Sequence, residues 1–107
     1  MGSTVGASYK TGSVVATGAD LTIRVVDFKP RKIVVTNETS LAEIEWHEGM
    51  DDGAAWKTVA AGTRTLEATT GITPEDGTSA LPPGFTIGAE ADINDTTTEI
   101  LQWEAWS

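Results

Sequence analysis

Residues 32–64 read KIVVTNETSLAEIEWHEGMDDGAAWKTVAAGTR, and this stretch decides the fold class. It contains three short runs of mostly alternating or β-branched apolar residues, separated by segments rich in Gly, Asn and Asp. Alternation with a period of two indicates β-strands, because successive side chains of a strand point to opposite faces. The separating segments are typical of the turns that join antiparallel strands. The stretch therefore predicts an antiparallel sheet.

Strand patterns continue on both sides of this stretch. The run at 32–37 is almost continuously β-branched and predicts a central strand that is covered on both faces. No helical apolar spacing persists for eleven residues, so helix is limited to one short turn at 38–42 or 54–56. The remaining strands are expected at 12–17, 21–28, 41–47, 55–60, 63–69, 85–87, 91–93 and 97–106. The chain is therefore expected to be all-β, either a small antiparallel β-sandwich of jelly-roll type or a β-tulip-like barrel.

The length of 107 residues is that of a single domain. Residues 1–12 are small and polar apart from Val5 and Tyr9, which predicts a flexible N-terminal arm followed by one β domain over 13–107. The segment 71–84, GITPEDGTSALPPG, holds three of the four prolines and predicts a long irregular loop. Such a loop is either a functional segment or a simple crossover.

The chain is acidic. Lys and Arg number 7 against 16 Asp and Glu, a formal net charge of −9 that argues against nucleic acid as a partner. The same charge serves solubility or attraction to a basic partner surface. The start of the chain does not have the pattern of a secretory signal, and no apolar run is long enough to span a bilayer. We expect synthesis and folding in the cytoplasm, with no membrane partner.

Residues that could carry catalysis stand alone. Without cysteine, neither a disulfide nor a thiolate site can form. His47 is the sole histidine and is expected at the surface, since a metal site or a general base needs partners. The segment 92–95 resembles the start of a calcium loop, but Thr97 occupies the glycine position. The sequons at Asn37 and Asn94 are expected to be chance matches. We therefore expect no catalytic residue, no metal, no cofactor and no enzymatic activity.

Four tryptophans form the other notable set of residues. Trp46 and Trp103 are expected in the core, where indoles fill a sandwich interior. Trp56 follows the acidic hairpin and Trp106 lies one residue from the C-terminus, so both are candidates for a protein interface or for stacking on a sugar. Leu81, in the proline-rich segment, is a third candidate for an interface.

Two segments carry a resemblance to a known class of proteins. They are 45–73, EWHEGMDDGAAWKTVAAGTRTLEATTGIT, and 84–106, GFTIGAEADINDTTTEILQWEAW. With the features W-x-E-G-M, AAGTRT and GFTIG-x-x-A-D-I-N and a final acidic aromatic strand, residues 30 to 106 resemble small structural proteins of tailed bacteriophages. Members of that class include β-sandwich or β-tulip decoration (cement) proteins, commonly trimeric, which sit on the capsid exterior and brace neighbouring capsomers.

The resemblance implies a function and partners. It implies a virion protein on the capsid exterior that binds the major capsid protein and itself as a homotrimer. Val5, Tyr9 and Lys10 of the arm would then contact the shell, although the 70–84 loop is an alternative contact. Two other functions stay open: a tail or head-tail component, and a carbohydrate-binding module on the virion that uses Trp56 or Trp106.

Overall fold

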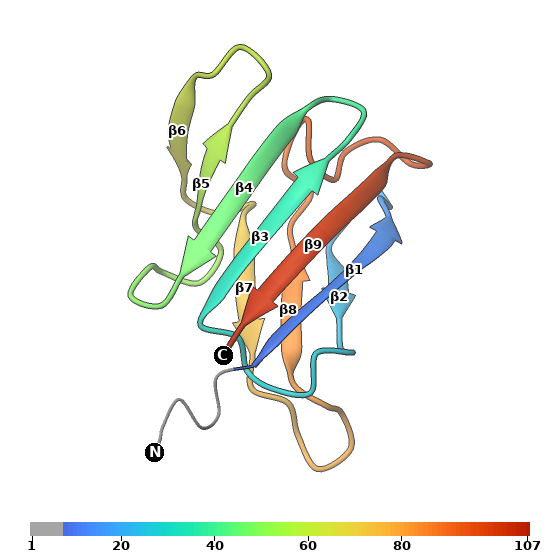
Figure 1. The fold of residues 1–107 in the computed structure, drawn as a ribbon, viewed down its shortest axis with the longest axis vertical. Helices are drawn as coiled ribbons and strands as arrows, with labels where there is room; N and C mark the ends of the chain where they lie inside the picture. The colour runs from blue at the N-terminus through green and yellow to red at the C-terminus, as the bar shows by residue number, and fades with distance from the viewer. Residues whose placement is uncertain (1–7) are drawn as a thin grey trace.

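The computed structural model describes residues 8–107, which form nine β-strands and no helix (Figure 1). The strands are β1 (Tyr9–Val15), β2 (Leu21–Ile23), β3 (Lys32–Asn37), β4 (Ala42–His47), β5 (Ala55–Thr58), β6 (Arg64–Glu67), β7 (Ile72–Glu75), β8 (Gly84–Ile87) and β9 (Ile100–Trp106). They build a six-stranded sheet in the order β1-β9-β3-β4-β5-β6 and a three-stranded sheet in the order β2-β8-β7. Every pairing between these strands is antiparallel.

The two sheets lie face to face, with the strands of the larger sheet crossing those of the smaller one obliquely (Figure 1). The prediction of an all-β antiparallel sandwich is confirmed. The sheets do not close into a barrel: β1 and β6 are the edges of one sheet, and β2 and β7 are the edges of the other.

Alternating side chains from both sheets fill the space between them. The larger sheet contributes Ile33, Ile44 and Trp46, and the smaller one contributes Ile72 and Ile87, all buried. Phe85 meets Trp103 edge to face, with ring centroids 5.6 Å apart, a favoured arrangement for aromatic pairs. Trp46 and Trp103 are both in the core, as predicted.

The central position of β3 is confirmed, but its expected cover on both faces is wrong. Its inward residues Ile33 and Val35 are buried, whereas Val34 and Thr36 are half-buried on the outer side. Val34 lies between Glu45 of β4 and Glu104 of β9 in the strand register. We attribute the partial burial of Val34 to these long side chains, which partly cover it although no further layer of structure packs on this face.

Two expected boundaries near the N-terminus differ from the structure. β1 begins at Tyr9, so residues 9–12 belong to the sheet and not to the arm. Gly12 in the middle of this strand has no side chain, which hid the alternation from the sequence pattern. The second strand was expected to run to residue 28 but ends at Ile23. The chain then turns, with Asp27 at a positive φ of 68°.

Two more expectations, for the second half of the chain, also differ. The segment 71–84 contains β7, so it is not irregular throughout. Pro74 is compatible with a strand here because β7 is an edge strand and needs no donor on its free side. The strand expected at 91–93 is a turn, in which Asp92 has φ 65°.

The described chain ends lie together. The backbone N–H of Ser107 donates to the carbonyl of Ser8 at 2.9 Å, and the N–H of Ser8 donates to the hydroxyl of Ser107 at 2.7 Å. These bonds extend the pairing of β1 with β9 by one residue.

Candidate functional site

Residues on one side of the six-stranded sheet point away from the core, and we call them the outer sheet face. The strand register aligns them in rows across the sheet, which include Tyr9, Trp106 and Lys32 in one row and Glu104, Val34, Glu45, Trp56 and Leu66 in the next. Two of the three interface candidates, Trp56 and Trp106, lie on this face and are half-buried. Aromatic and apolar side chains are therefore interspersed with carboxylates on a surface that the core does not use.

An aromatic pair occupies the corner of the outer sheet face where β1 begins. The rings of Tyr9 and Trp106 are 5.2 Å apart, and the ammonium group of Lys32 lies 5.1 Å from the Trp106 ring, within the range of a cation–π interaction. The Tyr9 hydroxyl donates to a carboxylate oxygen of Glu104 at 2.8 Å. This hydrogen bond, with smaller contributions from desolvation and from the charge of Glu104, raises the pKa of Tyr9 above its ordinary value.

A second aromatic position lies on the other side of the outer sheet face. The guanidinium of Arg64 lies 5.0 Å from the Trp56 ring, and Leu66 beside it is 58% exposed. Trp56, Leu66, Met50 and His47 line a shallow pocket of about 420 Å³ together with Gly49, Asp51 and Ala54. The pocket offers an indole and polar groups of the acidic β4–β5 loop to a ligand.

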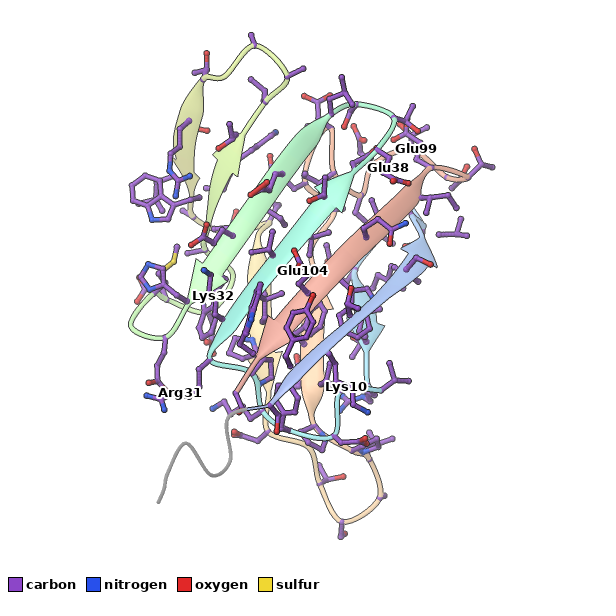
Figure 2. All side chains as sticks on the ribbon, viewed as in Figure 1. Lys10, Arg31, Lys32, Glu38, Glu99 and Glu104 are labelled. Carbon is purple, nitrogen blue, oxygen red and sulfur yellow. The ribbon has the colours of Figure 1, made fainter. Side chains whose placement is uncertain are left out.

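Charge is distributed unevenly along the strands of this sheet. Figure 2 shows Lys10, Arg31 and Lys32 near the end at which β1 and β3 begin, and Glu38 and Glu99 near the opposite end. The first end also holds carboxylates: Arg31 is paired with Glu48 at 2.8 Å and Lys10 with Asp27 at 2.9 Å. Among the described residues, Lys32 is the labelled cation that takes part in no ion pair.

The candidates expected in the arm have different surroundings. Tyr9 is on the outer sheet face, and Lys10 points to the other side of β1, where its ammonium group lies 2.9 Å from Asp27. Val5 lies outside the described residues. Leu81 is 47% exposed in the loop after β7, an edge strand of the smaller sheet, whereas both tryptophans belong to the larger sheet. The structure therefore brings Tyr9, Trp56 and Trp106 onto one face and leaves Lys10 and Leu81 apart from it.

The open side of the sandwich holds a groove that the sequence did not predict. It lies between β1, the edge of the larger sheet, and β2, the edge of the smaller one, and has a volume of about 510 Å³. Its lining comes from 10–14, from 22–25 and from Trp103. Only sheet topology shows that β1 and β2 are edges on the same side, so no residue pattern could have found it.

Among the described residues, the side chains that could act in catalysis or bind a metal ion do not lie together. His47 is exposed, and its Nδ1 lies 3.2 Å from the carbonyl of Glu48. No group of three or more histidines and carboxylates that could hold a metal ion occurs within residues 8–107. In the same part of the chain, no helix is long and apolar enough to cross a membrane.

Both sequon asparagines are buried and structural. Asn37 donates to the carbonyl of Ile93 and to Glu99, at 2.8 and 2.9 Å. Asn94 accepts from the N–H of Thr17 at 2.9 Å and donates to the carbonyl of Ala19 at 2.7 Å. Neither amide is accessible to a glycan in the folded protein, and Asn94 does not offer its oxygen to an ion.

A buried ion pair is the other polar feature that the sequence analysis missed. Lys57 of β5 points inward, and its ammonium group lies 2.8 Å from Glu90, which follows β8. The hydroxyl of Thr70 donates to the second carboxylate oxygen of Glu90. A lysine in an alternating strand is indistinguishable from a surface lysine until its partner is known.

No protein-family model, curated protein or solved structure matches the chain.

Proposed function

We propose that the protein is a non-enzymatic structural protein of a bacteriophage virion, a decoration protein that binds the exterior of the capsid and braces neighbouring subunits of the major capsid protein. The resemblance of residues 30 to 106 suggests this class. The observation that carries the proposal is the outer sheet face, where Tyr9, Trp56 and Trp106 are presented outside the core. Aromatic side chains presented in this way are the usual anchors of protein interfaces.

The aromatic residues of this face are held in place before any partner binds. Trp106 is contacted by Tyr9 and Lys32, and Trp56 by Arg64. A side chain that is already ordered loses less conformational entropy on binding, so more of its burial contributes to affinity. The carboxylates between the tryptophans set the register against a partner with basic groups.

The position of Lys32 at one end of the sheet, opposite the carboxylates at the other end, supports self-association as a homotrimer. Lys32 of one copy can face Glu38 and Glu99 of the next (Figure 2). Head-to-tail contacts of this kind form closed rings when the rotation between copies closes. In this proposal the protein is synthesised in the host cytoplasm and assembles as a trimer on the capsid exterior.

The test is binding to capsid shells of the parent phage that lack this protein. We expect the purified protein to co-sediment with the shells and to raise their melting temperature. Trp106→Ala and Trp56→Ala should each weaken binding about tenfold or more if these residues are central anchors. Leu81→Ala is the matched control. Loss of binding in Leu81→Ala alone, or no binding by the folded wild-type protein, would contradict the proposal.

A second candidate function is supported by the pocket at Trp56. An indole beside polar groups such as His47 and Asp51 has the chemistry of a stacking platform for a sugar ring. A carbohydrate-binding module on the virion would show saturable quenching of tryptophan fluorescence by sugars, lost in Trp56→Ala. If quenching is absent while shell binding is present, decoration remains the better proposal.

A further inference from the structure

β1 presents unpaired backbone groups along its free side. In an antiparallel ladder, alternate residues direct both their N–H and their C=O toward the neighbouring strand. The bonds Ser107 N to Ser8 O and Ala16 N to Glu99 O show that even-numbered residues of this segment point toward β9. The N–H and C=O groups of Tyr9, Thr11, Ser13 and Val15 therefore point to the open side.

The other edge strands are less suited to pairing. β2 has three residues and β6 has four, and β7 carries Pro74, which cannot donate. β1 has seven residues and no proline. A long edge strand without such protection is a template for an added strand.

The groove beside β1 offers side-chain contacts to an added strand. Gly12 lines it, and a Cβ at this position would lie 2.7 Å from Cζ2 of Trp103. The Trp103 indole therefore packs directly against the backbone of Gly12 and fills the space that a side chain would take. Nε1 of Trp103 is a hydrogen-bond donor for which we find no acceptor among residues 8–107. Trp103 is only 3% exposed, so it forms the floor of the groove and offers little surface to an added strand, whose contacts come from the other lining residues.

The charge of the groove is opposite to that of the chain. Lys10 and Arg24 line it, and no carboxylate does, although the chain has a net charge of −9. Lys10 is paired with Asp27 at the rim. Arg24 donates only to the carbonyl of Pro82 and takes part in no ion pair within the described part of the chain. Its guanidinium is therefore the group in the groove that is best placed to bind an added carboxylate.

We propose that the β1 edge binds an extended acidic segment of another protein by strand addition. Its backbone pairs with Tyr9, Thr11, Ser13 and Val15, and an acidic side chain on the groove side reaches Arg24. Only the identity of the protein that supplies the segment rests on the proposed function, in which it would be a subunit of the shell.

The probe is a fluorescein-labelled seven-residue peptide of alternating glutamate and valine, with lysine in place of glutamate in the control peptide. Fluorescence anisotropy should show that the glutamate peptide binds about tenfold or more tightly than the lysine peptide, and that salt weakens it. Equal affinity for the two peptides, or no binding of the glutamate peptide, would overturn the proposal.

Two pairs of variants test the two contacts separately. Ser13→Pro removes a free-side donor without removing a bond to β9, and should weaken binding about five- to tenfold. Ser13→Ala keeps the N–H and should bind as the wild type does. Arg24→Gln should weaken binding by a similar factor, while Arg24→Lys should retain most of it. Far-UV circular dichroism and melting temperature verify that each variant is folded.

Hydrogen exchange locates the bound peptide and does not depend on any variant. In the free protein, the amides of Thr11 and Ser13 should exchange quickly and those of Gly12 and Val14 slowly. The glutamate peptide should protect Thr11 and Ser13. Protection elsewhere, or a dimer of the chain that Ser13→Pro abolishes in the absence of peptide, would overturn the proposal in favour of another site or of self-pairing. Shell binding that survives Ser13→Pro would show that the shell does not supply the segment, and would leave the decoration function intact.

Discussion

The ammonium group of Lys57 lies 2.8 Å from a carboxylate oxygen of Glu90, and both side chains are buried inside the sandwich. The pair ties β5, near the edge of the larger sheet, to the segment that follows β8 of the smaller one. Removing two charges from water is costly, so the net contribution of such a pair to stability is small, but leaving one charge alone costs far more.

Lys57→Met should therefore lower the free energy of unfolding by about 3–5 kcal/mol, because it leaves Glu90 buried without its partner. The double variant Lys57→Met with Glu90→Leu should recover most of this loss. Urea unfolding followed by tryptophan fluorescence measures both. A double variant no more stable than the single one would contradict this account of the pair.

Gly12→Ala should destabilise the protein by about 1–3 kcal/mol, because the new methyl group would overlap the Trp103 indole, with Cζ2 2.7 Å away. Near-UV circular dichroism should change as the indole moves. Ser13→Ala, on the opposite face of the same strand, is the control and should leave both signals unchanged. Wild-type stability in Gly12→Ala would mean that Trp103 relaxes freely.

Asn94→Ala should lower the free energy of unfolding by about 1–3 kcal/mol, because it removes a buried amide and its hydrogen bonds to the backbone. The amide accepts from the N–H of Thr17 and donates to the carbonyl of Ala19, which also accepts from the Thr17 hydroxyl. Thr96→Ala destroys the same sequon at an exposed position and should cost little. Thermal unfolding separates the structural role of Asn94 from any role of the sequon.

Tyr9 is the sole tyrosine, so the absorbance of tyrosinate reports this residue alone. Its pKa is raised from the ordinary 10.0, chiefly by the hydrogen bond to Glu104. A raised folded-state pKa means that the contribution of this bond to stability is complete below pH 10.0 and is lost as the pH rises through the folded-state pKa.

Native protein should therefore titrate at higher pH than urea-unfolded protein. Glu104→Gln should shift the native titration back toward the unfolded one, because it weakens the hydrogen bond to the Tyr9 hydroxyl and removes the charge that opposes ionisation. Glu45→Gln, on the same face, serves as the control. An identical titration in Glu104→Gln and in the wild type would show that another group holds the Tyr9 hydroxyl.

The residues that repeat with a period of two were the ones that sequence could place. Trp46 was predicted in the core because it alternates with polar neighbours, Trp103 because indoles commonly fill a sandwich interior, and β3 was predicted as central from its β-branched run. Position in a sheet is a property of distant segments, so the pairing of Lys57 with Glu90 and the groove between β1 and β2 had no local signal. The same limit applies to residues 9–12, whose strand depends on pairing with β9.

The bonds between Ser8 and Ser107 have a practical consequence for redesign. A short glycine-serine linker can join these two positions without disturbing either sheet, since the ends already touch. New termini could then be opened at Gly62, in the exposed β5–β6 turn, where an added Cβ would have no neighbour within 4 Å. Such a circular permutant would carry a fused cargo at the far end of the hairpin and keep every core residue in its present neighbourhood.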